Sequence, residues 1–162
     1  MRTMKEIFGY LLGGLLFVGL IPSFMWLLSG MPAFLPENWV RLVASVFLAI
    51  VGLTVSVWSI VHMRRRGNGN PMDAFGHEVA PRTRHLMTDG PYRLSRNPML
   101  TGTFVYLIGV CVWLWTWQAL AVYILFVAIM LVQVSTEEAR LHRDFGNEYE
   151  AYCHRTGRFL PF

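Results

Sequence analysis

One polar segment of the sequence contains residue types that could bind a charged ligand. It reads Thr88-Asp89-Gly90-Pro91-Tyr92-Arg93 and continues, after two residues, as Arg96-Asn97-Pro98-Met99. Asp-Gly-Pro disfavours a helix, and the proline that follows Gly90 should restrict this glycine to extended conformations. Asn97 is a good helix N-cap, and Pro98 is tolerated at the first helical position. The spacing therefore predicts a tight turn followed at once by a helix.

Charged residues at both ends of the apolar stretch that follows could form the walls of a site. A helix N-terminus beside Tyr92, Arg93 and Arg96 would suit an anionic group such as a carboxylate. Glu137 and Glu138 come directly after the stretch. At that depth acidic side chains are costly unless they are paired or solvated. A carboxylate facing Arg93 or Arg96 across a pocket could bind a cationic or hydroxyl-bearing ligand.

Purely structural interpretations of the same residues remain open. A turn, a helix cap and arginines that reach lipid headgroups would account for the first segment. Ser135 and Glu138 fit a capping box, which would account for the second. The five histidines have no metal-ligand spacing, so no metal site is predicted. Glycine motifs of nucleotide-binding folds are also missing from the sequence.

The composition points to a membrane protein. Hydrophobic residues make up 54% of the 162 residues and charged residues only 15%, whereas soluble domains are roughly 25% charged. The length predicts a single domain over 1–162. The net charge of +4 could suggest nucleic acid, but the basic residues flank apolar stretches, so no nucleic-acid partner is predicted. Two cysteines, one inside an apolar run, make a disulfide framework improbable.

Three stretches without charge must carry the membrane-spanning helices. They cover 7–36, 42–61 and 97–136. A spanning helix needs about 20 residues, so the third stretch can hold two helices, with a break at the Trp-rich sequence 115–118. Gly13, Gly14 and Gly19 should serve helix packing. We therefore predict an all-α integral membrane protein with four transmembrane helices, near 7–29, 40–63, 99–115 and 118–135.

The positions of lysine and arginine predict the orientation. Four spans place both termini, the loop 64–98 and the tail 136–162 on one side, together with 13 of the 14 basic residues. The positive-inside rule puts that side in the cytoplasm and the turns 30–39 and 115–118 outside. In the tail, four apolar positions fall on one helical face, which predicts an amphipathic helix at the membrane surface. They are Leu141, Phe145, Tyr149 and Tyr152.

Five linked motifs over 82–162 give the sequence a family resemblance. It resembles the isoprenylcysteine carboxyl methyltransferases and the related phospholipid methyltransferases, in their bacterial form. The motifs are Leu86-Met87-Thr88-Asp89-Gly90-Pro91-Tyr92, Arg96-Asn97-Pro98-Met99-Leu100, Glu137-Glu138-Ala139-Arg140-Leu141, Phe145-Gly146-Asn147-Glu148-Tyr149 and Leu160-Pro161. Asn97 stands where eukaryotic members have histidine, and Leu100 where the family usually has tyrosine.

The resemblance implies methyl transfer from S-adenosyl-L-methionine to a lipophilic acceptor. It places Arg96 and Glu138 as candidate catalytic residues. It also implies a cofactor pocket between the loop, the start of the third span and the glutamates. The residues carried over to that pocket are Arg84, His85, Leu86, Met87, Tyr92, Asn97, Pro98, Met99, Leu100 and Glu137. A site at the membrane interface would serve a charged cofactor from water and an acceptor from the bilayer.

The acceptor stays open between an isoprenoid or prenylcysteine-like carboxylate and a phospholipid-like amine. A carboxylate needs no general base, whereas an amine must first lose a proton. The bacterial form of the motif predicts the bacterial inner membrane as the location. Two other classes compete with this reading. One is a membrane reductase of the sterol-reductase kind, which would use NADPH, and the other is a non-enzymatic membrane scaffold.

Overall fold

A computed structural model describes residues 13–33, 35–36, 38–66, 73–74, 77–78 and 86–160, with backbone alone at 73–74 and 77–78. In these residues the regular secondary structure is helical apart from two paired two-residue strands. In chain order the elements are the π-helix η1 (Leu15–Leu20), α2 (Ile21–Leu28), α3 (Trp39–Arg66), β1 (Asp73–Ala74), β2 (His77–Glu78), the 3-10 helix η2 (Gly90–Arg93), α4 (Pro98–Leu114), α5 (Trp117–Phe145) and α6 (Asn147–Cys153). β1 and β2 pair in antiparallel register.

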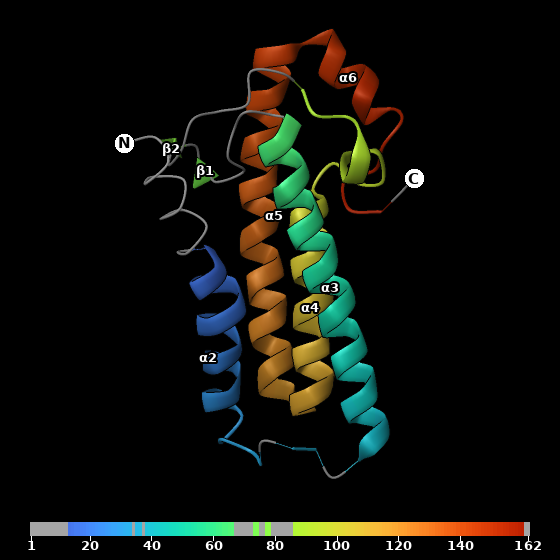
Figure 1. Ribbon diagram of the computed structural model, residues 1–162. Helices are drawn as coiled ribbons and strands as arrows, with labels where there is room; N and C mark the ends of the chain where they lie inside the picture. Colours follow the sequence, from blue (N-terminus) through green and yellow to red (C-terminus); the bar gives the residue numbers. More distant parts are fainter. Residues whose placement is uncertain are drawn as a thin grey trace, which may run out of the picture.

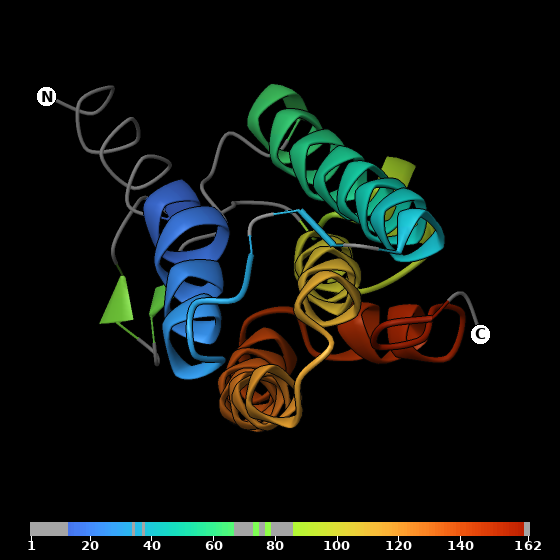
Figure 2. The ribbon, with the colours of Figure 1, turned by 90° about the horizontal axis from the view of Figure 1, so that it is seen from below.

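Four helices lie side by side, and α6 crosses one end of the bundle (Figure 1). Viewed along the bundle, α4 lies between α3 and α5, and α2 lies beside α5 (Figure 2). The end at which α6 lies carries many arginines, at the C-terminal ends of α3 and α5 and before α4. We call it the basic end. Its arginines include Arg64, Arg65, Arg66, Arg93, Arg96, Arg140, Arg143, Arg155 and Arg158.

Small residues let α3 and α4 approach closely. A Cβ atom added to Gly102 would overlap the Ser56 hydroxyl and the Gly52 carbonyl oxygen, and one added to Gly52 would overlap the Tyr106 backbone nitrogen. Glycine is therefore required at both positions. The glycines expected to serve packing behave differently, since Gly14 has open space where its Cβ would be. For Gly14 that expectation is wrong, and the close packing lies instead between α3 and α4.

The buried core joins α2 to the α4–α5 hairpin. Met25 of α2 is fully buried against a cluster from the other two helices. Outside this core the helices expose apolar side chains, among them Val43, Phe47 and Ile50 on α3 and Leu125 on α5. Soluble monomers rarely expose apolar surface so extensively. The outer faces are thus suited to a lipid environment.

Two helices, α3 and α5, are long and apolar enough to cross a membrane, and two shorter apolar helices cover Leu15–Leu28 and Pro98–Leu114. The helical fold is confirmed, but among the described residues only two helices are long enough to span a membrane, fewer than the four predicted. Shorter helices occupy the other two predicted places. The predicted start of the first span, before residue 13, lies outside the described residues.

The turn opposite the basic end forms where the sequence predicted a break. α4 ends at Leu114, and Trp115 adopts a left-handed conformation with φ of 52°. Thr116 then caps α5 by accepting a hydrogen bond from the Ala119 backbone nitrogen. Arg41 of α3 reaches across and donates to the Trp113 carbonyl oxygen at 2.8 Å. This contact satisfies one of the carbonyl groups left free at the end of a helix.

The end of α5 contradicts two predictions. The helix continues to Phe145, ten residues past the predicted end, so Ser135 is interior to it. Its hydroxyl donates to the Leu131 carbonyl oxygen, and the predicted capping box does not exist. The predicted amphipathic tail helix is also wrong, because Gly146, with φ of 49° and ψ of −124°, separates α5 from the short α6. The face from Leu141 to Tyr152 is therefore interrupted.

The turn before α4 agrees with the prediction in position but not in conformation. Pro98 is the first residue of α4 and Asn97 precedes it, as expected. The Asn97 side chain, however, makes no cap and donates to the Arg158 carbonyl oxygen instead. Gly90 is not extended but has φ of +58°, and it opens the 3-10 helix η2. Packing explains this conformation, because a Cβ at Gly90 would overlap the His62 ring.

Candidate active site at the basic end

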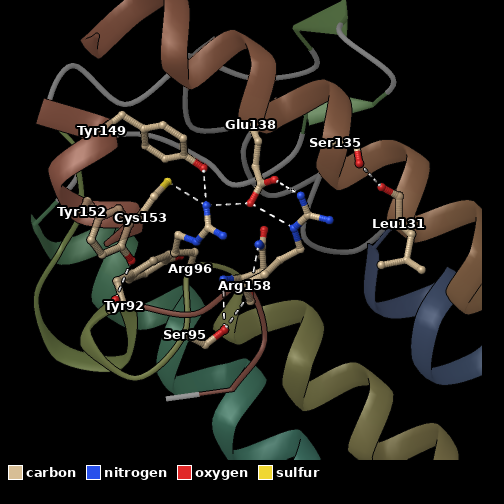
Figure 3. A network of polar contacts seen from close by, with 11 residues as sticks. Tyr92, Ser95, Arg96, Leu131, Ser135, Glu138, Tyr149, Tyr152, Cys153 and Arg158 are labelled. Carbon is tan, nitrogen blue, oxygen red and sulfur yellow. Dashed lines mark hydrogen bonds and ion pairs between the residues drawn. The ribbon is translucent and has the colours of Figure 1, made fainter. Parts of the chain in front are cut away.

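Arg96 lies at the centre of a polar cluster between α4, α5 and α6 (Figure 3). Its Nη1 atom is 2.9 Å from the Oε1 atom of Glu138 on α5. The same nitrogen donates to the Cys153 sulfur at 2.7 Å and to the Tyr149 hydroxyl at 3.4 Å, both from α6. The structure thus brings together Arg96 and Glu138, the two residues expected to be catalytic, and it joins them directly as an ion pair.

Glu138 is held from a second side by Arg158, whose Nε and Nη2 atoms donate to the two carboxylate oxygens. The side chains of Arg96 and Glu138 are only 15% and 12% exposed. Desolvation disfavours the charged form of Arg96, but the adjacent Glu138 carboxylate, with Tyr149 and Cys153, raises its pKa above the ordinary value. Burial raises the pKa of Tyr149, so its phenol stays protonated and can accept from Arg96. The cluster is a buried carboxylate between two guanidinium groups, with Tyr149 and Cys153 beside Arg96.

The chain after α6 folds back onto the residues that start α4. The Arg158 carbonyl oxygen accepts hydrogen bonds from Ser95 at 3.1 Å and from Asn97 at 3.2 Å. The Gly157 carbonyl oxygen accepts from the backbone nitrogen of Arg96 at 2.9 Å, and the Phe159 carbonyl oxygen accepts from Thr101 at 3.3 Å. Backbone carbonyl groups of the tail therefore fix the conformation of the segment that carries Arg96.

A second polar group fixes the turn to α3. The His62 Nε2 atom is 2.9 Å from one oxygen of Asp89, and Arg66 Nη1 lies 2.7 Å from the other. Tyr92 follows in η2. It is buried, its ring centre is 6.4 Å from that of His62, and its carbonyl oxygen accepts a hydrogen bond from the Tyr152 hydroxyl. The turn is thus clamped between α3 and α6.

The other predicted cofactor residues have varied surroundings. Arg84 and His85 lie outside the described residues. Leu86, Met87 and Met99 are half-buried at the basic end, and Pro98 is buried. Leu100, which replaces the family's tyrosine, packs against the apolar core. Glu137 does not face Arg96 or Arg93, because its Oε1 atom lies 3.6 Å from Nη2 of Arg140 on the same helix.

Sequence reasoning missed several residues that build this site. Arg158 and Cys153 were given no role, and His62 was noted for its lack of metal spacing alone. A signal existed for Arg158, since it lies two residues before the closing Leu160-Pro161 motif. No local pattern marks His62, because its contact with Asp89 depends on how α3 packs against the turn.

A cavity of about 410 Å³ lies between η1, α3 and α4. Its walls are mainly apolar, and Arg64 is the one charged residue among the described residues that line it. The lining residues are Gly13, Gly14, Phe17, Val18, Leu53, Ser56, Val57, Ile60, Val61, Arg64, Met99, Thr103 and Tyr106. Met99 connects the two regions, because it lines the cavity and stands two residues after Asn97 at the start of α4.

Residues 40–148 match the phospholipid methyltransferase family. The chain belongs to this family. The match runs from α3 through the turn, α4 and α5, so Arg96 and Glu138 lie inside the region shared with other phospholipid methyltransferases. Arg158 and Cys153 lie beyond it. No curated protein and no solved structure matches the chain. Family membership makes the protein a methyltransferase of membrane type.

Proposed function

We propose that this phospholipid methyltransferase family member transfers a methyl group from S-adenosyl-L-methionine to a lipophilic acceptor at the cytoplasmic face of a bacterial inner membrane. The observation that carries the proposal is the meeting of Arg96 and Glu138. They come from opposite ends of the α4–α5 hairpin, yet their side chains form a buried pair at the basic end. The apolar cavity between η1, α3 and α4, which Met99 at the start of α4 lines, would supply the acceptor from the bilayer side.

The residue types at the basic end suit the functional groups of S-adenosyl-L-methionine. The Nε atom of Arg96 is buried and has no hydrogen-bond partner within the described part of the chain. An unsatisfied buried donor costs about 1–3 kcal/mol, and a ligand carboxylate would remove that cost. Glu137 keeps a side chain that is 33% exposed, and its carboxylate suits a ribose hydroxyl or an ammonium group. Tyr92, Asn97, Pro98, Met99 and Leu100 would form the adjoining wall.

S-adenosyl-L-methionine supplies an electrophilic methyl group, which a nucleophile takes from the sulfonium sulfur as the bond pair returns to sulfur. The task of the chain is to position the reactants and to exclude water. The clamps at Ser95, Asn97 and Arg158 keep the segment of Arg96 rigid. Arg96 and Glu138 neutralise each other in the resting protein, so a ligand carboxylate would compete with Glu138 for the guanidinium.

The same proposal includes the topology. The 17 residues of α4 span roughly 25 Å at about 1.5 Å per residue. That is at the lower end of the about 17–25 residues that cross a bilayer. Together with α3, α5 and the helix at the N-terminal end, this supports four spans in a single domain over 1–162. The concentration of arginines at the basic end favours that end as cytoplasmic.

Calorimetric titration of the detergent-purified protein with S-adenosylhomocysteine tests the cofactor. Glu137→Gln should weaken binding, whereas Glu148→Gln, an exposed change in α6, should leave it unchanged. A parallel titration with NADPH separates the methyltransferase from a membrane reductase. Heat with NADPH but none with S-adenosylhomocysteine would overturn the proposal. Equal affinity in the Glu137→Gln and Glu148→Gln variants would remove Glu137 from the pocket.

A further inference from the structure

From the cavity between η1, α3 and α4 we infer the chemical class of the acceptor, an inference that rests on the proposed function. We propose that the cavity holds a single apolar chain, and that Arg64 at its rim binds an anionic oxygen-bearing head group, either a carboxylate or a phosphate. The volume of about 410 Å³ falls within the roughly 300–1,000 Å³ of ligand pockets.

The walls select an apolar chain because their polar groups are already satisfied. The hydroxyl groups of Ser56 and Thr103 both donate to the Met99 carbonyl oxygen, at 2.9 and 3.0 Å. The Tyr106 hydroxyl donates to the Val18 carbonyl oxygen at 3.1 Å. Little hydrogen-bonding capacity is left for a polar ligand inside. A hydrocarbon chain would lose no hydrogen bonds on entering the cavity. It would gain van der Waals contacts with a wall of matching shape.

The position of the cavity allows entry from the bilayer. Three of its lining residues, Val18, Val57 and Val61, are also exposed on the outer surface, at 44%, 56% and 38%. They belong to two helical segments, η1 and α3, which lie on different sides of α4. A lipid chain could therefore slide in sideways without crossing water.

Arg64 supplies the charge for the head group. It lies on the exposed end of α3 and makes no ion pair or hydrogen bond with any residue that the structure describes. Its neighbours differ, because Arg66 is bound to Asp89 at 2.7 Å and Arg65 does not line the cavity. Arg64 would thus lie next to the head group of a bound chain. Charge complementarity then favours an anionic head group.

Met99 explains how the chain could meet the methyl donor. It lines the cavity and also belongs to the proposed cofactor wall, at the first turn of α4. Methyl transfer requires the nucleophile and the methyl carbon to approach in line at close range. A head group held between Arg64 and Met99 would lie at the junction of the two regions. Carboxylates and phosphate-containing head groups both carry the anionic oxygens that Arg64 would bind.

Photo-labelling without any methyl donor tests the site. The purified full chain would be exposed to three probes with the same diazirine-bearing chain, a fatty acid, a lysophosphatidic acid and a fatty alcohol. Both anions should modify α3 and η1 peptides that line the cavity more strongly than the alcohol does. Equal labelling by all three, or labelling confined to the outer face of α5, would overturn the inference. The stronger of the two anions identifies the head group.

Two variants with matched controls sharpen this test. Val57→Trp should fill the cavity and reduce labelling to the background level, whereas Val43→Trp, also exposed on α3 but outside the cavity, should not. Arg64→Gln should lower the preference for anions over the alcohol roughly two- to fivefold, the range for one exposed charge pair. Arg65→Gln should keep the preference. Loss of preference in both arginine variants, or in neither, would contradict a role for Arg64.

Turnover separates failure of this inference from failure of the proposed function. Membrane lipids and a radioactive methyl donor would be supplied to wild type and to Val57→Trp. We expect Val57→Trp to lose methyl transfer but to bind S-adenosylhomocysteine as wild type does. Unchanged transfer would show that the cavity does not hold the acceptor. Lipid labelling of the cavity in a protein that does not bind S-adenosylhomocysteine would instead overturn the proposed function alone.

Discussion

Glu137 and Glu138 are neighbours in sequence but lie in opposite surroundings. Glu138 is 12% exposed and paired with Arg96 and Arg158, whereas Glu137 is 33% exposed beside Arg140. Successive residues of a helix point about 100° apart, so one glutamate must face α6 when the other faces away. Glu138 should therefore contribute more to stability than Glu137 does.

The two glutamates should respond differently to the same substitution. Glu138→Gln leaves Arg96 buried without its counter-charge, so the free energy of unfolding should fall by about 3–5 kcal/mol. Glu137→Gln removes a carboxyl whose pKa burial and the charge of Glu138 raise to about 7, so at neutral pH it should leave the free energy of unfolding unchanged or slightly higher. Thermal unfolding of both variants in detergent, followed by circular dichroism, measures this. Equal losses of stability would contradict the assignment of the buried pair.

Asp89 should make stability depend on acid pH. The hydrogen bond from His62, followed by the charges of His62 and Arg66, lowers the pKa of Asp89 below its usual value despite partial burial. A carboxyl with a lowered folded pKa stabilises the protein above its unfolded pKa of about 3.9. This contribution disappears as the pH falls through the folded value.

Asp89→Asn should consequently reduce stability at neutral pH and lose its effect in acid. Because the Asp89 side chain is 45% exposed, the loss should stay below about 1 kcal/mol. Unfolding midpoints of wild type and Asp89→Asn, recorded from pH 7 down to about 3, should converge at the acid end. Curves that stay parallel would show that the His62 contact does not depend on the charge of Asp89.

Much of this site was predictable at the level of residues, but not the pairing. The motifs marked Arg96, Asn97 and the two glutamates, and the hairpin between them brings both groups to one end. The rotation of α5 about its axis decides which glutamate faces Arg96, and that rotation depends on the packing of α6. Arg158 was hidden for the same reason, since its contact with Glu138 spans 20 residues and two chain reversals.

At the scale of elements, the break at Gly146 shapes the basic end. The backbone there has φ of 49° and ψ of −124°, a region that residues with a side chain rarely adopt. Apolar residues keep helical spacing across the break, from Leu141 to Tyr152, and therefore the sequence pattern predicted one helix. A glycine in a helical pattern can lie inside a helix or end it. Here the tertiary contacts of Tyr149 favour the end of the helix.

Gly146→Ala tests the importance of that break. A Cβ at Gly146 meets nothing within 4 Å, so any effect must come from backbone strain, on the order of 1–3 kcal/mol. We expect a lower free energy of unfolding and weaker contacts between α6 and Arg96. Hydrogen exchange at the backbone amides of 147–153 should accelerate relative to those of α4. Unchanged exchange in the variant would show that alanine tolerates this conformation.

The α3–α4 contact should be equally sensitive to one methyl group. Gly102→Ala would place a Cβ against Ser56 and the Gly52 backbone, and overpacking of this kind costs about 1–3 kcal/mol. Gly19→Ala is the matched control, because its Cβ would make a single ordinary contact, 3.8 Å from Leu15. Thermal midpoints in detergent should fall for Gly102→Ala and hold for Gly19→Ala. The reverse order would contradict the close approach of α3 and α4.

For the whole molecule, hydropathy predicted where the helices lie far better than where they pack. A charge-free stretch predicts a helix, because in lipid the backbone N–H and C=O groups must form hydrogen bonds within the segment. Which helices touch depends on small residues, and Gly52 and Gly102 could be recognised only once α3 and α4 were known to be adjacent. The cavity was unpredictable for the same reason, because it exists where η1 and α3 fail to fill the space beside α4.

Cysteine labelling can establish the orientation. In intact bacterial cells, a membrane-impermeant maleimide should label Leu35→Cys, on the exposed turn between α2 and α3. It should not label Arg93→Cys, which is exposed at the basic end. Permeabilised cells should show both signals, against the background of the native chain. Labelling of Arg93→Cys alone in intact cells would invert the proposed topology.

The backward fold of the tail has a consequence for how the protein is made. The carbonyl groups that hold Ser95, Asn97 and Thr101 belong to Arg158 and Phe159, near the end of the sequence. Because a chain is synthesised from its N-terminus, the segment of Arg96 enters the membrane long before its clasp exists. Until Arg158 and Phe159 have been synthesised, the segment of Arg96 therefore lacks the hydrogen bonds that fix its conformation.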